Sequence, residues 1–277
     1  MGPSEPEPEP YGLCSLGTIE ARIAQILETA NVPSILWGDA VFGLFGQELP
    51  MTCSEWVIPD EGFNLAVEAL VNNVHVELCW RAPTPGTEVA ADGHQLQCPW
   101  QPPDGMNCRP QPDAHLIALD AYINLYRHSR LLWWVPTRLA MGDKALDNAN
   151  QFYMSTSDER LPAPETTRHR GGPGRGPMDL AVTGFPVRML APDTYAAALV
   201  FLAVRDTGHD VEQHWHGEMK KMAAAVAGFP LFRPDYLPPR FIDDYFFHRE
   251  QSYVTMRSFI YSWQRTPDQM PRLRGFR

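Results

Sequence analysis

The sequence predicts an α+β fold, with a small mixed sheet flanked by helices and followed by a mainly helical C-terminal part. Two observations favour this class. Residues 18–80 alternate between segments with helical periodicity and short apolar segments typical of strands. From residue 187 onward, apolar residues recur at helical spacing over much longer segments. The 277 residues are enough to bury the core of one large domain or two small ones.

The N-terminal elements follow from periodicity and from turn residues. Ile19, Ile23 and Ile26 share one helical face, and Thr18 precedes them as an N-cap. Helices of this kind are expected at residues 18–30, 39–46 and 61–72. Short apolar or alternating segments predict strands at residues 32–37, 51–58 and 73–81.

Later segments are more helical. Residues 115–136 predict a strand pair, or a strand and a short helix, ending before Pro136. The segment 191–206 is apolar on nearly all sides, which predicts a buried central helix. Further helices are expected at 207–228 and 240–263.

The chain therefore divides into four expected parts. They are a disordered Pro/Glu tail, an α/β domain containing a long loop at 82–112, a helical subdomain and a loose tail, spanning residues 1–14, 15–186, 187–265 and 266–277.

The composition argues against several classes of partner and cellular location. A net charge of −10 argues against a nucleic-acid backbone as the main partner. No apolar run reaches about 18 residues, so no membrane span is expected. The acidic N-terminus lacks the features of a secretory signal, and the five cysteines include no CxxC pair. We expect a cytoplasmic protein with a small-molecule substrate and no cofactor, and the sequence does not indicate an oligomeric state.

Several segments carry a resemblance to a known family. Residues 35–58 follow the order strand, WG turn, helix, threonine, strand. The other matching segments are HLIAL (115–119), LYRHSRLLWWVP (125–136), the GRG loop (174–176) and PVRMLAPDTYAAALVFLAVRD (186–206). In this order they resemble fungal proteins of the nucleotidyltransferase fold, in the DNA polymerase beta-like superfamily, most of which have no assigned activity.

The resemblance implies a phosphate-binding turn at Gly38 and Asp39, where a helix N-terminus offers free N–H donors. A tight turn capped by Asp39 is the alternative. The family also carries two metal-binding acids on alternate positions of the second strand, and aligning Thr52 places Ser54 and Trp56 there. Neither replaces a carboxylate as a Mg²⁺ ligand, so two-metal chemistry is expected to be absent. Glu55 is expected to face the other side of the strand unless a bulge turns it.

Other titratable groups take the place of these acids in our interpretation. His75 and Glu77 share the polar face of residues 74–80, and could form an acid/base pair beside Ser54 and Trp56 or an exposed edge-strand pair. His115 matches a family histidine, and either reaches the same cleft or ends a strand.

Three further features have two readings each. Arg170 and Arg175 in the basic glycine-rich run either clamp an anionic group or belong to a surface loop. Tryptophans 56, 80, 133 and 134 either line the cleft or fill the core. His209, His214 and His216 lack the i, i+4 spacing of a zinc helix, so a solvated face is expected and no metal site is predicted.

The functional hypothesis is a repurposed nucleotidyltransferase-fold enzyme of fungal specialised metabolism. It would act on a small organic substrate by metal-free acid/base chemistry, as a cyclase or isomerase. Its expected catalytic residues are His75, Glu77 and His115. One alternative is a Mg-dependent nucleotidyltransferase with a metal site rebuilt from Glu55, Glu77 and Asp60, and another is a non-catalytic ligand-binding module.

Overall fold

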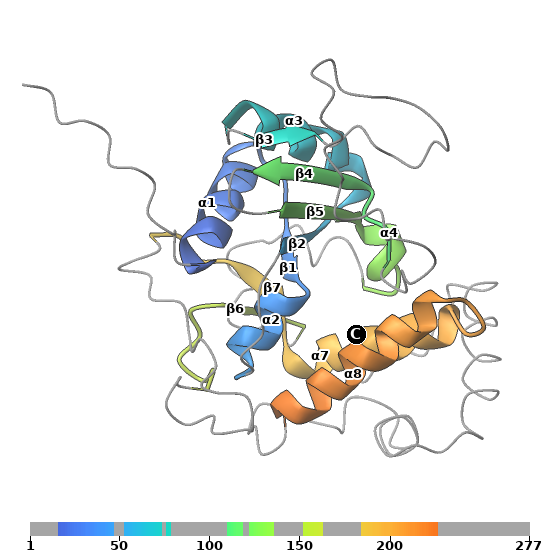
Figure 1. The fold of residues 1–277 in the computed structure, drawn as a ribbon. Coiled ribbons are helices and arrows are strands. Elements are labelled where there is room, and N and C mark those ends of the chain that lie inside the picture. The colour runs from blue at the N-terminus through green and yellow to red at the C-terminus, as the bar shows by residue number, and fades with distance from the viewer. Residues whose placement is uncertain are drawn as a thin grey trace, which may run out of the picture.

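The structure, a computed structural model, describes residues 16–46, 53–73, 76–78, 110–118, 122–135, 152–162 and 184–226. These residues form a seven-stranded mixed sheet in the order β3-β4-β5-β2-β1-β7-β6, with helices packed against it (Figure 1). The predicted α+β class, a mixed sheet flanked by helices, is confirmed. The expected helix at 240–263 and the two terminal tails lie outside the described residues, as does all but the last part of the 82–112 loop.

The bounds agree with the predicted elements in most places. The helices are α1 (Leu16–Thr29), α2 (Asp39–Leu44), α3 (Phe63–Asn73), α4 (His128–Leu131), α7 (Pro192–Arg205) and α8 (Val211–Val226). The strands are β1 (Ile35–Trp37), β2 (Cys53–Ile58), β3 (Val76–Leu78), β4 (Ala114–Ala118), β5 (Tyr122–Arg127), β6 (Tyr153–Ser155) and β7 (Arg188–Leu190). None of the helices in the described ranges has the length and apolar character to cross a bilayer.

Strand β2 is the centre of the sheet. It pairs antiparallel with β1 and parallel with β5, and its Glu55 lies opposite Trp37 on one side and Asn124 on the other. Strand β7 pairs with β1 and β6, so the sheet continues beyond residue 186, where a helical subdomain was expected to begin. The two strands β6 and β7 have three residues each and were not predicted.

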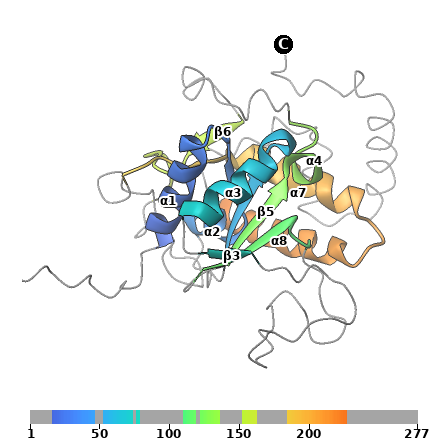
Figure 2. The ribbon, with the colours of Figure 1, turned by 90° about the horizontal axis from the view of Figure 1, so that it is seen from above.

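The two faces of the sheet meet different helices. On one face, Arg127 lies 4.2 Å above the ring of Phe63 from α3. On the other, Trp37 stacks on Tyr195 of α7 with ring centroids 4.4 Å apart. Figures 1 and 2 show α1 and α3 together on one side of the molecule, while α7 and α8 run side by side on the other.

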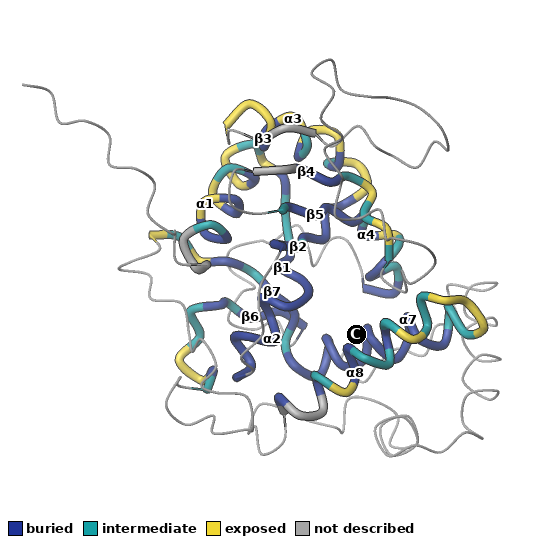
Figure 3. Tube along the Cα trace, viewed as in Figure 1, coloured by how far each residue is buried: buried dark blue, intermediate teal, exposed yellow. Residues whose placement is uncertain are grey.

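Helix α7 is the main helical contribution to the core. All its residues from Pro192 to Val204 are buried, as the prediction of a buried central helix requires. Figure 3 shows the contrast with α3, which carries exposed stretches that include Leu65 and Val71. Burial of an almost uniformly apolar helix is a large part of the driving force for folding.

Trp56 and Ser54 belong to the core rather than to an open groove. Trp56 is 0% exposed, Ser54 is 3% exposed, and the indole Nε1 donates a hydrogen bond of 2.8 Å to Ser54 Oγ. The expectation that these two side chains project into a groove is therefore wrong. The indole occupies core volume between the sheet and its helices, which agrees with the alternative reading of this tryptophan.

Replacing Ser54 with Ala should lower the free energy of unfolding by about 1–3 kcal/mol, because the buried indole N–H would lose its acceptor. Chemical denaturation measures the change. In a Trp56→Phe background, which has no N–H to satisfy, the same serine substitution should cost much less, and equal costs in both backgrounds would contradict the assignment.

Candidate functional site

A glycine turn brings three elements together at the end of β1. Gly38 has φ 74° and ψ −150°, a conformation that is essentially restricted to glycine. Its N–H donates to the Tyr195 hydroxyl of α7 at 3.0 Å. A Cβ at position 38 would lie 1.8 Å from Glu55 Oε2, so the carboxylate of β2 packs directly against the missing side chain.

This contact fixes the orientation of β2. Glu55 lies on the Gly38 side of the strand, and Trp56 lies on the opposite side. The pairing of β2 with both neighbours is continuous, so no bulge is needed to place Glu55 there. We expected Ser54 and Trp56 to lie on the Gly38 side of the strand, and this geometry corrects that expectation. Position 55 supplies the acid that faces the turn.

A lysine from α8 joins two carboxylates beside the same turn. Lys221 Nζ lies 2.7 Å from Asp39 Oδ1 and 2.8 Å from Glu218 Oε1. The ammonium also lies 5.6 Å from the centroid of the Phe42 ring. Asp39 and Glu218 are both buried while the Lys221 side chain is 29% exposed, so these ion pairs are partly shielded from water and are stronger than pairs on an open surface. We call Asp39, Glu218 and Lys221 the lysine cluster.

The environment changes the protonation of Glu218. Burial raises its pKa to about 7, and the nearby carboxylates of Asp39 and Glu55 add to the increase, while Lys221 opposes it. The net pKa of Lys221 is raised: burial acts to lower it, and Glu218 and Asp39 outweigh that effect. A carboxyl with a pKa near neutrality can both give and accept a proton, which is the property of a general acid or base.

The turn at Gly38 is therefore a poor place for a bare phosphate. The Glu55 carboxylate covers Gly38, and Asp39 adds a second acidic group on α2. An anion here would meet like charges, and α2 has only six residues, which gives it little dipole. The predicted phosphate-binding role of Gly38 and Asp39 stays a prediction, while the geometry assigns them to the turn and to the lysine cluster.

A row of polar side chains extends from Glu55 across the neighbouring strands. Glu55 lies in register with Asn124 of β5, and Asn124 with His115 of β4. Asn124 Oδ1 lies 2.7 Å from His115 Nδ1, and the imidazole stacks on Tyr122 with centroids 5.5 Å apart. Burial lowers the pKa of His115 although the hydrogen bond opposes the change, so the ring is neutral at pH 7. We call Glu55, Asn124 and His115 the polar row.

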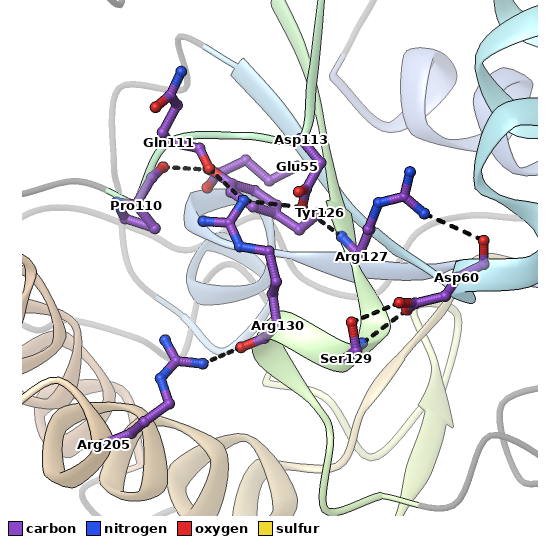
Figure 4. Close-up of polar contacts among 10 residues, drawn as sticks. All are labelled: Glu55, Asp60, Pro110, Gln111, Asp113, Tyr126, Arg127, Ser129, Arg130 and Arg205. Atoms are coloured by element: carbon purple, nitrogen blue, oxygen red, sulfur yellow. Dashed lines mark hydrogen bonds and ion pairs between the residues drawn. The ribbon is translucent and has the colours of Figure 1, made fainter.

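Figure 4 shows the contacts at one end of this row. The Tyr126 hydroxyl donates to Glu55 Oε1 at 2.9 Å and lies 3.4 Å from the Pro110 carbonyl oxygen. Asp60 is engaged elsewhere, because its carboxylate accepts hydrogen bonds of 2.9 and 2.6 Å from the backbone and hydroxyl of Ser129. Asp60 thus holds the start of α4 and is not a member of the lysine cluster.

The arginines in the same view also form ion pairs and hydrogen bonds within the protein. Arg130 pairs with Asp113 at 3.0 Å and donates to the Gln111 carbonyl, while Arg205 donates to the Arg130 carbonyl. Arg205 further pairs with Asp206 at 2.6 Å. These contacts join α4, α7 and the segment before β4, and they give the arginines a structural role.

The remaining expected site residues fall largely outside the described residues. His75, Arg170 and Arg175 lie there, and Glu77 is described only as the middle residue of β3, paired with Ile117. His216 lies 3.4 Å from Glu212 on α8. Within the ranges described, no group of three or more His, Cys, Asp or Glu side chains is arranged to hold a metal ion.

Four residues of the site were missed by sequence reasoning: Asn124, Tyr195, Glu218 and Lys221. Glu218 and Lys221 lie at i and i+3 on a helix whose polar residues were read as a solvated face. Asp39, the other partner of Lys221, is 182 positions away, so local sequence carries no signal of the contact. Tyr195 was placed correctly on a buried helix, and its hydroxyl in an apolar segment was the available clue.

Gly38→Ala should destabilise the chain by about 2–4 kcal/mol, because a Cβ meets Glu55 and the backbone conformation disfavours an L side chain. Gly184→Ala is the matched control: φ is +71° there, but no atom lies within 4 Å of the added Cβ. It should cost about 1 kcal/mol, from the backbone alone. Equal losses for the two variants in chemical denaturation would contradict the packing of Glu55 on Gly38.

Glu218→Gln should change how stability depends on pH. A carboxyl whose pKa rises from 4.5 to about 7 on folding binds its proton more tightly in the folded chain. Its contribution to stability is fully present below the unfolded pKa and falls as pH rises through the folded one. The glutamine variant should therefore gain on the order of 2 kcal/mol relative to the native chain between about pH 4.5 and pH 7. Denaturation at several pH values tests this, and a constant difference would contradict it.

Comparisons with known proteins give one structural similarity. No protein-family model matches the chain, and no curated protein sequence matches it. A solved structure described as an antigenic nucleotidyltransferase-like protein from Paracoccidioides brasiliensis is similar at 16% sequence identity and a TM-score of 0.38. The match covers 91% of this chain and 89% of that one.

Proposed function

We propose that the chain is a nucleotidyltransferase-like protein that converts a small organic substrate by metal-free acid/base chemistry. The observation that carries the proposal is the lysine cluster, where a buried carboxyl with a pKa of about 7 lies 2.8 Å from an ammonium group. The proposed substrate is an intermediate of fungal specialised metabolism. Cyclisation or isomerisation is the class of reaction.

Such a step needs only one group that gives a proton to the substrate and then takes one back. Glu218 in its protonated form gives a proton to a substrate oxygen or carbon, and Lys221 stabilises the carboxylate that remains. The carboxylate then takes a proton from another position of the same molecule. The product has the composition of the substrate, so no oxidant, reductant or second substrate is required.

The two-metal chemistry of nucleotidyl transfer fits these residues poorly. Asp39 and Glu218 hold a lysine ammonium between them, which places a positive charge where a divalent ion would have to approach. Ser54 and Trp56 lie in the core, and Asp60 holds α4. No step is therefore assigned to a metal ion.

The expected catalytic residues keep a place in the proposal. His115 belongs to the polar row, which shares Glu55 with the turn at Gly38. Glu77 is the middle residue of β3, next to β4 in the sheet, and it lies in register with Ile117, two positions from His115. His75 lies outside the described residues. They stand as further acid/base candidates, and Arg170 and Arg175 as candidates for holding an anionic group of the substrate.

A Mg-dependent nucleotidyltransferase is the second candidate. One observation favours it, namely that Glu55 faces the glycine turn between β1 and α2, so an acid lies on the second strand beside the turn. That position would let Glu55 bind a metal if Lys221 left the cluster. A non-catalytic binding module is the third candidate, and it predicts no turnover under any condition.

Untargeted mass spectrometry of a fungal metabolite extract tests the leading proposal. With EDTA present, the purified chain should convert one metabolite into a product of identical mass, and Glu218→Gln should slow this by about a hundredfold or more. Lys221→Met should also reduce the rate, because the carboxylate would lose its counter-ion.

Arg160→Gln is the matched control. The Arg160 side chain is 64% exposed and forms its ion pair with Asp158, which is not a member of the lysine cluster, so this variant should leave the rate unchanged. Pyrophosphate release from nucleoside triphosphates in Mg²⁺, abolished by Glu55→Gln, would overturn the proposal in favour of nucleotidyl transfer. The absence of any conversion in the extract would favour the binding module.

A further inference from the structure

Asn124 carries a buried hydrogen-bond donor that has no acceptor among the described residues. The side chain is 0% exposed, and its Oδ1 is committed to His115. Its Nδ2 has no hydrogen-bond partner in the described part of the chain. Leaving such a donor unsatisfied destabilises the folded chain, so a native chain retains one mainly where something else supplies the acceptor.

The position of Asn124 connects this donor to the candidate site. Asn124 is the middle residue of the polar row, with Glu55 in register on β2 and His115 in register on β4. Tyr126, two residues further along β5, contacts Glu55 from the same face of the sheet. The unused N–H groups therefore belong to the face that carries the glycine turn.

The committed oxygen of Asn124 determines the state of His115. Because Oδ1 can only accept, the hydrogen of the contact belongs to His115 Nδ1. The neutral ring is thus held with its proton on Nδ1 and with its plane fixed between Asn124 and Tyr122. Asn124 acts on this histidine as a positioning residue.

We propose that Asn124 Nδ2 binds a carbonyl or hydroxyl oxygen of an uncharged small organic substrate while Oδ1 positions His115. This inference rests on the proposed function, since the molecule bound is the substrate of the acid/base step. The charge follows from the neighbours. Glu55 lies beside Asn124 and would repel a carboxylate or phosphate, whereas a neutral oxygen satisfies the amide donor without that cost.

The experiment observes the side-chain amide groups of asparagine by NMR in ¹⁵N-labelled protein, with cyclohexanone as the uncharged carbonyl probe. Cyclohexanone should shift the Asn124 amide signal in a saturable manner. Cyclohexanecarboxylate has a similar ring but a negative charge, and its affinity should be lower by a factor of about ten or more. The Asn73 amide is an internal control, because its Nδ2 already donates to the Ala69 carbonyl at 2.8 Å, and its signal should stay unchanged.

Two variants separate the two roles of the side chain. Asn124→Asp keeps an acceptor for His115 Nδ1 and loses the donor, so the imidazole ¹⁵N shifts should still report a proton on Nδ1. The cyclohexanone response is compared between the native chain and this variant through the saturable change of those imidazole shifts, and it should vanish in the variant. Asn124→Leu removes both contacts, so the fixed tautomer should be lost as well. A cyclohexanone response that survives Asn124→Asp would overturn the proposal.

Other outcomes also decide the matter. If cyclohexanone leaves the Asn124 signal unchanged and the amide instead shows a persistent contact with bound water, the donor serves a structural water and the inference fails. Equal binding of the carboxylate would overturn the assignment of an uncharged ligand. A response at Asn124 without any metal-free turnover of the extract would support the oxygen site and reject the acid/base function, so the two failures are distinguishable.

Discussion

The contact between Gly38 and the Glu55 carboxylate is the constraint on which the rest of the site depends. A residue with any side chain at position 38 would displace that carboxylate, and its backbone would leave the conformation that aims its N–H at Tyr195. The contact thus sets how β1, β2 and α7 meet. Because strand residues alternate between faces, it also decides that Trp56 enters the core while Glu55 faces the turn.

Acidic groups outnumber the cation near this contact. Glu55, Asp39 and Glu218 bring three carboxyl groups close enough for each of the other two to raise the pKa of Glu218. Lys221 supplies one positive charge between two of them. If Glu218 binds a proton, the remaining two carboxylates face one ammonium, and repulsion is reduced. Burial is thus the main reason that Glu218 titrates near neutral pH, and the excess of acids over cations around one turn adds to the rise in its pKa.

The sequence determines the local elements well because their signals are local. The segment of α7 is apolar on every side, and such a helix has no stable position except the interior. The phase of β2 is different: nearly all its residues are buried, so the alternation that would identify a face is absent. The contact of Lys221 with Asp39 joins positions 182 residues apart and depends on how α8 lies against α2. No periodicity or motif encodes such a contact, and the polar face of α8 reads as solvated without it.

Glu55 belongs to the polar row and also acts electrostatically on Glu218 of the lysine cluster, so the charge of a bound molecule matters. The carboxylate raises the pKa of Glu218 on one side and lies in register with Asn124 on the other. An anion bound at Asn124 would add to the repulsion and raise the pKa of Glu218 further, so the carboxyl would stay protonated and accept no proton at neutral pH. A cation would lower that pKa and leave the carboxyl ionised. Only an uncharged molecule preserves a group that is poised to transfer a proton in either direction.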